Sequence, residues 1–466
     1  MQKAIKRFSY FIAGCFVMYG VYLVYFVFWK APLLEQKGAN PRPWILESRI
    51  QRGGIFARGG EKIAESLPSG GQFVRKYYYG SAYAHIVGYE SKRLGKTGVE
   101  SSYDGQLLGL EGSIKKRLEV RWGVKGVKGN DIVLTVDHLL QLEACRLLSP
   151  YRGAAVVLNP KTGEILALAS SPSFDPNPPC LERNWEKLKG EPDHPLLNRA
   201  TMGLYPPGSV LKIVTASLGL RRFPGLEGEV YECRGEIKID GRVLKDLRPH
   251  GEVDLKRALA LSCNSYFVEL GLRLGADDFA RGLAAFGWGG DFHFDIPAQR
   301  IPLPRESFYT PDGLAEAAIG QGEIVVTPLF MAMVAGAIGN DGVMMKPYLV
   351  SEIRGQDGSV LWRARPTVLR IAVSPEIAAK VREAMVEVVK NGTGTAAAIP
   401  GMDVAGKTGS AENPAGEPHA WFVALAPAQD PQVAVSVIIE HGGQGGRVAA
   451  PIARELIKIA LRRGGF

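Results

Sequence analysis

Residues 205–216 read Tyr205-Pro206-Pro207-Gly208-Ser209-Val210-Leu211-Lys212-Ile213-Val214-Thr215-Ala216. The two prolines and the glycine exclude helix up to Gly208, because proline lacks an N–H and disfavours α geometry in the residue before it. From Ser209 onward the residues become apolar and predict a helix to about Leu220. Ser209 is therefore expected in the first turn, where free backbone N–H groups favour developing negative charge.

Lys212 follows Ser209 by three residues and is expected on the same helical face. A serine hydroxyl is a poor nucleophile until a neighbouring group takes its proton, and a desolvated lysine can do so near neutral pH. The pair alone is a weak signal. Ser-x-x-Lys is common by chance, and it also describes a capped helix whose lysine reaches solvent.

Two later segments strengthen the prediction of a reactive serine. Ser262-Cys263-Asn264 lies between the apolar helical segments 254–261 and 266–274, and Lys407-Thr408-Gly409-Ser410 precedes an apolar run at 420–425 that predicts a buried strand. Ser-x-x-Lys, Ser-x-Asn and Lys-Thr-Gly, in this order, are the signature of penicillin-binding proteins and serine β-lactamases. The chain resembles a class B penicillin-binding protein, a monofunctional peptidoglycan D,D-transpeptidase. Further matching segments are Tyr205–Gly208, His419–Phe422 and Ala449–Ala453.

The resemblance implies a fold and a reaction. The fold is α+β, of the penicillin-binding transpeptidase and serine β-lactamase type: an antiparallel sheet flanked by helices, plus an all-helical subdomain. The reaction forms a serine acyl-enzyme at the D-Ala-D-Ala end of a peptidoglycan stem peptide, and an amine of a neighbouring stem resolves it into a crosslink. β-Lactams acylate the same serine. No metal or organic cofactor is expected.

The resemblance also assigns roles to residues of the three motifs. Ser209 is the nucleophile, Lys212 its general base, and Ser262 a proton shuttle to the leaving nitrogen. Asn264 would bind the substrate backbone, and Lys407 would supply a positive field. Thr408 and Gly409 would bind substrate, with the Thr408 hydroxyl on the terminal carboxylate. The backbone N–H groups of Ser209 and Ser410 would form the oxyanion hole.

Lys-Thr-Gly occurs three times, so the functional copy has to be identified. Lys96-Thr97-Gly98 precedes the serine and lies in a polar, glycine-rich segment. Lys161-Thr162-Gly163 follows Asn159-Pro160 between two apolar runs, which is typical of a turn. Only Lys407 follows both other motifs and leads into a predicted strand, so the first two copies are predicted to be loops.

Two alternative functions remain open at this level. The same motifs serve carboxypeptidases and β-lactamases, which use water as acceptor, although a β-lactamase has no need for about a hundred additional residues before its catalytic domain. A β-lactam-binding sensor or scaffold is the third possibility. Sensors usually carry further membrane helices and a cytoplasmic domain, whereas seven residues precede the apolar run here.

Residues Phe8–Trp29 carry no charge and are long enough to span a bilayer as a helix. Lys3, Lys6 and Arg7 precede this run, so the positive-inside rule predicts a cytoplasmic N-terminus and an extracytoplasmic catalytic domain. A cleavable signal peptide should end in small residues, which this run does not. Lipidation at Cys15 is disfavoured, because the apolar run continues well past it.

The predicted organisation is an anchor at 1–30, a small β-rich pedestal or dimerisation-like domain at 31–130, and the transpeptidase domain at 131–466. Residues Gln51–Gly60 resemble the membrane-proximal motif of class B proteins, with Ala57 and Gly59 where Asp and Asn are usual. Most charges of the pedestal are expected to be solvated. A lipid-II polymerase of the SEDS type is the membrane partner that the resemblance suggests.

The net charge of +9 is spread along the chain and does not indicate nucleic-acid binding. The five cysteines show no metal or redox spacing, and a Cys180–Cys233 disulfide is left open. Residues 171–199, rich in proline, asparagine and charge, are predicted to form a loop. The last helix is predicted at 450–461, after a glycine turn at 442–446.

Overall fold

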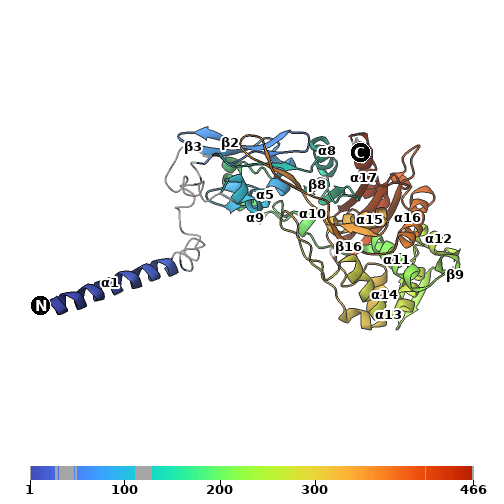
Figure 1. Ribbon diagram of the computed structural model, residues 1–466. Coiled ribbons are helices and arrows are strands. Elements are labelled where there is room, and N and C mark those ends of the chain that lie inside the picture. Colours follow the sequence, from blue (N-terminus) through green and yellow to red (C-terminus); the bar gives the residue numbers. More distant parts are fainter. Residues whose placement is uncertain are drawn as a thin grey trace.

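The computed structural model describes residues 2–26, 30, 47, 50–110, 128–414 and 416–463 (Figure 1). A five-stranded antiparallel sheet lies at the centre of the part of the chain after residue 131, in the order β17-β18-β19-β7-β8. Its strands are β7 (Gly153–Leu158), β8 (Ile165–Ser171), β17 (Ala405–Asn413), β18 (Gly416–Ala426) and β19 (Val433–Ile439).

Helices cover both faces of this sheet, because alternate strand residues point to opposite sides. Val156 of β7 belongs to a core shared with α11 (Lys212–Arg222), α13 (Asn264–Phe286) and α15 (Pro328–Gly339). Val157 faces a second core, built with α8 (His138–Leu148) and α17 (Gly445–Arg463). Further helices of this part of the chain are α12 (Leu255–Leu261), α14 (Pro311–Ala318) and α16 (Pro375–Lys390). The predicted α+β fold is confirmed.

A second sheet is assembled from three separate parts of the chain, in the order β15-β14-β6-β1-β2-β3. Its strands are β1 (Ile55–Phe56), β2 (Lys62–Ser69), β3 (Gln72–Tyr77), β6 (Asp131–Leu134), β14 (Val350–Arg354) and β15 (Val360–Arg363). β6 pairs with β1 in parallel and with β14 antiparallel. The hydrogen-bonded sheet therefore crosses the predicted domain boundary at residue 131.

Short elements complete the fold. Near β1 to β3 these are α4 (Ala84–Val87), β4 (Glu90–Ser91), β5 (Gly95–Lys96), α5 (Gly98–Ser102) and α6 (Asp104–Leu107). Near α12 and α13 they are β9 (Tyr231–Cys233), β10 (Glu236–Ile239), β11 (Arg242–Lys245) and β12 (Gly251–Val253). A further pair of strands is β13 (Val343–Met345) and β16 (Val368–Ile371). Figure 1 shows the β2–β3 sheet and the α13–α14 region at opposite ends of this body.

The predicted loop at 171–199 is wrong for most of its length, because α9 (Pro178–Gly190) occupies it. Proline is well placed in the first turn of a helix, where its missing N–H has no intrahelical partner. Leu181, Trp185 and Leu188 then follow at helical spacing and pack into one small cluster with Phe174. The short helix α10 (Arg199–Met202) begins where the loop was expected to end.

The last helix begins at Gly445, earlier than the predicted residue 450. Glycine is needed there because the helix start packs tightly on the sheet. A Cβ at Gly445 would lie 2.1 Å from the carbonyl oxygen of Trp421 and 2.4 Å from that of Gly409. The glycines that predict a turn thus permit a close approach of helix to strand.

The expectation of solvated charges in the pedestal is wrong for Arg52, Arg75 and Glu100. Glu100 is fully buried, and its carboxylate forms ion pairs with Arg75 Nε at 2.6 Å and Arg52 Nη2 at 2.9 Å. Burial alone would raise the pKa of Glu100, and the two guanidinium groups outweigh it, so the pKa is lowered. A paired, hydrogen-bonded carboxylate tolerates burial that an isolated one would not.

The N-terminal helix α1 (Gln2–Tyr25) is long and apolar enough to cross a membrane. Its described part agrees with the predicted apolar run. Residues 27–29 of that run, and residues 31–46 and 111–127 of the predicted pedestal, lie outside the described residues.

Candidate active site

The turn that carries Ser209 is a short 3-10 helix, Gly208–Leu211, which leads directly into α11. Gly208 has φ of +54°, and its N–H donates to the carbonyl oxygen of Gly320 at 2.8 Å. A Cβ at Gly208 would lie 2.9 Å from the carbonyl oxygen of Ser410. Strand β17 therefore passes directly beside the turn, and half-buried Ser209 lies between helix and strand.

Lys212 occupies the first position of α11 and is fully buried. Its Nζ donates to the carbonyl oxygen of Ser262 at 2.8 Å and to Asn264 Oδ1 at 2.6 Å. Ser262 ends α12 with φ of +59°, and α13 begins at Asn264. Burial lowers the pKa of Lys212 to about 8, because the charged ammonium loses its hydration.

Lys407 on β17 is also fully buried and approaches the same turn. Its Nζ donates to Ser262 Oγ at 2.9 Å and to the carbonyl oxygen of Thr408 at 3.0 Å. Lys212 Nζ lies 3.4 Å from the same Ser262 Oγ. Burial, and then the neighbouring Lys212, lower the pKa of Lys407 well below its usual value. The structure thus brings the three predicted motifs together at Ser262.

Thr408 and the residues after it form the edge of this site. The hydroxyls of Thr408 and Thr393 lie 2.6 Å apart, and a Cβ at Gly446 would lie 3.4 Å from Thr408 Cγ2. Ser410 is exposed, whereas Gly409 is buried against the nucleophile turn, with its Cβ position 3.0 Å from the carbonyl oxygen of Pro207. Sequence analysis missed Thr393, although its place in a glycine-rich turn before the strand was a possible signal.

An ion-pair network centred on the buried carboxylate of Glu440 supports the chain before Ser209. Glu440, just after β19, accepts hydrogen bonds at Oε1 from Tyr205 Oη and Arg199 Nε, both at 2.7 Å. Its other oxygen pairs with Arg152 at 2.8 Å. Trp421 Nε1 donates to the carbonyl oxygen of Pro206 at 2.9 Å. These side chains hold the segment leading to Ser209 against the sheet; sequence analysis placed Tyr205 and Trp421 in segments that match the family but did not identify Arg152, Arg199 or Glu440.

The other two Lys-Thr-Gly copies lie elsewhere. Lys161 sits in the turn between β7 and β8, is 43% exposed, and pairs with Asp430. Lys96 ends β5 and pairs with Glu47 and Asp104 at 2.6 and 2.7 Å. In the part of the chain that the structure describes, Lys407 is the copy that contacts Ser262.

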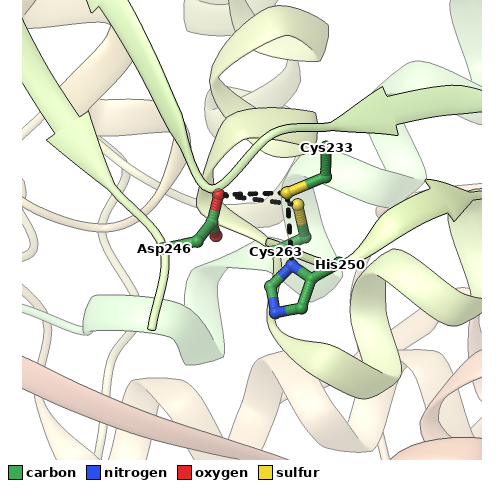
Figure 2. A group of neighbouring side chains, drawn as sticks. All are labelled: Cys233, Asp246, His250 and Cys263. Carbon is green, nitrogen blue, oxygen red and sulfur yellow. Dashed lines mark hydrogen bonds between the residues drawn. The ribbon is translucent and has the colours of Figure 1, made fainter. Parts of the chain in front are cut away.

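A group of possible metal ligands lies immediately behind the Ser262–Asn264 turn (Figure 2). Cys233, Asp246, His250 and Cys263 come from three segments of the chain, since Asp246 and His250 share the loop between β11 and β12, and their ligand atoms all lie within 4.8 Å of one another. The irregular spacing along the sequence concealed this group. The cysteines at 180 and 233 are both free thiols, so the disulfide that the sequence left open is not formed.

A serine in the turn before a buried helix lies beside an antiparallel strand, and two desolvated lysines, one on that helix and one on that strand, meet at a Ser-x-Asn turn. This fold and this arrangement define a serine acyl-transfer enzyme of the penicillin-interacting class. The chain belongs to the penicillin-binding protein family: the model of the penicillin binding protein transpeptidase domain matches residues 153–458, and that of the penicillin binding protein A dimerisation domain matches residues 52–122.

Named relatives and solved structures agree with this assignment. Peptidoglycan D,D-transpeptidase PbpA of Mycolicibacterium smegmatis is 37% identical over 461 residues, covering 91% of this chain and 92% of the relative. The D,D-transpeptidase domain of a peptidoglycan glycosyltransferase from Eggerthella lenta superimposes with a TM-score of 0.82 at 37% identity, covering 90% of this chain and 99% of that one. Penicillin-binding protein A of Mycobacterium tuberculosis, solved as a ceftriaxone acyl-enzyme complex, gives 0.83 at 35% identity, covering 89% and 99%.

Proposed function

We propose that this protein is a membrane-anchored peptidoglycan D,D-transpeptidase in which Ser209 forms the acyl-enzyme. The observation that carries the proposal is the meeting of Lys212 and Lys407 at Ser262, beside the turn that holds Ser209. A relative named as a peptidoglycan D,D-transpeptidase and a related structure solved as a β-lactam acyl-enzyme support the same reaction.

Acylation begins with attack of Ser209 Oγ on the carbonyl carbon of the penultimate D-Ala. The hydroxyl proton passes to Lys212, whose pKa of about 8 leaves a fraction neutral near physiological pH. The oxyanion would be stabilised by the backbone N–H groups of Ser209 and Ser410, and the close packing of β17 against the turn at Gly208 supports this role.

Release and transfer use the rest of the site. The proton travels through the Ser262 hydroxyl to the leaving nitrogen as the C–N bond breaks and D-Ala departs. An amine of a second stem peptide then attacks the ester, the C–O bond breaks, and Ser209 regains its proton. Asn264 binds the substrate backbone, and Thr408, supported by Thr393, binds the terminal carboxylate in the positive field of Lys407.

Covalent labelling by a fluorescent penicillin tests the nucleophile. Wild type and Ser217→Ala should label, whereas Ser209→Ala should not. Ser217 is a matched control, because it is a buried serine on the same helix that donates only to the backbone of Ile213. Retained folding of each variant is checked by circular dichroism. Labelling of Ser209→Ala at the wild-type level would refute the assignment.

Product analysis tests the reaction itself. A stem-peptide donor is incubated with and without an amine acceptor. Crosslinked product is expected in the presence of the acceptor. Free D-Ala with no crosslink would indicate a carboxypeptidase, and acylation by penicillin with neither product would indicate a sensor or scaffold.

The same proposal includes an organisation and a location. An anchor at 1–30 and a pedestal at 31–130 would hold the catalytic segment 131–466 on the outer face of the membrane, with the N-terminus in the cytoplasm. The apolar helix α1 and the basic residues in its first turns, Lys3, Lys6 and Arg7, support this orientation. A SEDS-type lipid-II polymerase is the proposed membrane partner. Reporter fusions at each end test the orientation, and co-purification from membranes tests the partner.

A further inference from the structure

The four side chains behind the Ser262–Asn264 turn are arranged as a metal site would be (Figure 2). Cys233 ends β9, Asp246 follows β11, His250 precedes β12, and Cys263 lies between α12 and α13. Cys233 Sγ lies 3.4 Å from Asp246 Oδ2 and 3.4 Å from His250 Nδ1, and Cys263 Sγ lies 3.8 Å from Asp246 Oδ2. Three segments, of which the loop at 246–250 supplies two residues, thus direct four ligand atoms at a common point.

These distances match the edges of a zinc tetrahedron. Zinc bonds of about 2.3 Å to sulfur and about 2.0–2.1 Å to nitrogen or oxygen place a sulfur about 3.5 Å from either lighter ligand and two sulfurs about 3.8 Å apart. All ligand atoms already lie within 4.8 Å of one another. The widest pair has to close by about 1 Å to reach a tetrahedral edge.

The chemistry of the ligands selects the metal. Two thiols, one imidazole and one carboxylate are typical ligands of zinc, whereas magnesium and calcium prefer oxygen. Cys233 and Cys263 are buried at 1% and 0% exposure, so solvent does not compete for the sulfurs. Binding releases the protons of both thiols.

The site is joined to the catalytic turn by covalent and hydrogen bonds. Cys263 is the middle residue of Ser262-Cys263-Asn264. Asp246 accepts hydrogen bonds from the backbone N–H of Asn264 and, at 3.2 Å, from that of Ser265. The carbonyl oxygen of Lys245 accepts from Asn264 Nδ2 at 2.8 Å. A metal holding Cys263 and Asp246 would therefore fix the turn that positions Ser262 and Asn264 against Lys212.

We propose that Cys233, Asp246, His250 and Cys263 bind one zinc ion, which acts as a structural clamp on the Ser262–Asn264 turn. Zinc does not take part in acyl transfer, because the ligand atoms lie behind the turn and all four positions are filled by protein. The link to acylation rests on the proposed function; the metal site itself does not.

Metal analysis of the purified full-length protein is the first test. Inductively coupled plasma mass spectrometry should find about one zinc per chain in wild type, in Ser209→Ala and in Cys180→Ser, and strongly reduced zinc in Cys233→Ser and His250→Ala. Cys180 is the matched control, since it is a free cysteine on α9 outside the group. Wild type with no more zinc than Cys233→Ser, or a Cys233–Cys263 disulfide in protein isolated from cells, would overturn the proposal.

Cobalt exchange keeps the test independent of variant folding. Wild-type protein in which Co²⁺ replaces zinc should show a thiolate-to-cobalt charge-transfer band and the visible bands of a tetrahedral ion, and Cys180→Ser should show the same spectrum. A spectrum without thiolate ligation would overturn the assignment of Cys233 and Cys263.

Penicillin acylation measures the role of the clamp. Cys233→Ser should acylate about 10- to 100-fold more slowly than Cys180→Ser, because a ligand that orients catalytic residues has effects of this size. Ser209→Ala should keep its zinc while losing all acylation, which separates failure of the catalytic assignment from failure of the metal site. Unchanged acylation in a zinc-free Cys233→Ser protein that remains folded would overturn the clamp.

Discussion

At the scale of single residues, identical triplets have different environments. Lys407 is fully buried and bonds to Ser262, whereas Lys161 is 43% exposed and pairs with Asp430. Sequence order was sufficient to select Lys407, since turn chemistry explains the triplet at 161–163. The sequence could not show that Lys212 and Lys407 would share one hydroxyl, because that contact joins residues far apart in the chain.

Replacing Lys407 should have a much larger effect on acylation than replacing Lys161. Lys407→Ala removes a buried cation from the site and is expected to slow acylation by fluorescent penicillin about 100-fold. Lys161→Ala loses only a surface ion pair and should acylate at the wild-type rate. The second-order rate constant is measured for each variant, and equal losses would show that the triplet is wrongly assigned.

The buried carboxylate of Glu100 allows a residue-scale test of stability. Glu100→Ala leaves Arg52 and Arg75 without their shared partner and should lower the free energy of unfolding by about 3–5 kcal/mol. Glu383→Ala is the control, because Glu383 is 69% exposed in its pair with Lys256 and should change the value by less than about 1 kcal/mol. Chemical denaturation of both variants provides the comparison, and similar losses would refute the argument.

At the scale of elements, the apolar helical segment 254–261 was predicted well, as α12 (Leu255–Leu261), and proline-rich segments were not. Thr327 caps α15 by accepting from the N–H of Phe330, and Pro328 takes the first helical position. Two adjacent prolines after Asn177 begin α9 in the same way, yet the surrounding charge favoured a loop. The helix is stabilised by its contact with Phe174 and Tyr89, which no local pattern reveals.

The loop after α14 should be sensitive to one added methyl group. Gly320 has φ of +80°, and a Cβ there would lie 2.1 Å from the carbonyl oxygen of Gly208. Gly320→Ala should therefore displace the nucleophile turn and slow acylation at least about tenfold, because small errors in position have large catalytic effects. Gly225→Ala is the matched control: its φ is +86°, but its Cβ would meet nothing within 4 Å. Acylation rates and thermal melts of both variants are compared, and equal acylation would contradict the prediction.

At the scale of the whole molecule, His85 joins the segment that matches the dimerisation domain to the segment that matches the transpeptidase domain. It is on α4, and its Nε2 donates to the carbonyl oxygen of Pro195 at 2.9 Å. Ser173 Oγ, 3.4 Å from Nδ1, and the ring of Phe174 also face it. Burial lowers the pKa of His85 to about 4, from 6.5, and the positive charge of Arg199 adds to the shift.

The stability of the folded protein should decrease in acid because of His85. Below pH 6.5 the unfolded chain binds a proton at His85 that the folded protein accepts only near pH 4, so stability falls as pH decreases through this interval. The free energy of unfolding that is lost over this interval amounts to about 3 kcal/mol, at ~1.4 kcal/mol per unit of pKa difference. His85→Gln keeps a donor for Pro195 without titrating, and its melting temperature should fall less between pH 7 and pH 5. An identical fall in both proteins would exclude His85 as the cause.

The fold class of the whole molecule could be predicted from the sequence, but the pairing of strands that lie far apart in the chain could not. The order of the three motifs led to the correct fold. It also predicted that one site contains Ser209, Lys212, Ser262, Asn264 and Lys407. Pairing of β6 with both β1 and β14 was not foreseen, because strand partners are chosen by packing across hundreds of residues. The grouping of Cys233, Asp246, His250 and Cys263 was hidden for the same reason.

The sheet that is assembled from three separate parts of the chain also determines when, during synthesis of the protein, its strands can pair. A chain that is synthesised from its N-terminal end delivers β1, β2, β3 and β6 long before β14. Until residues 350–354 emerge, the outer edge of β6 has no neighbour on that side. This sheet therefore cannot be completed until β14 has been synthesised. A chain that stops before β14 would expose the unpaired edge of β6 to other molecules.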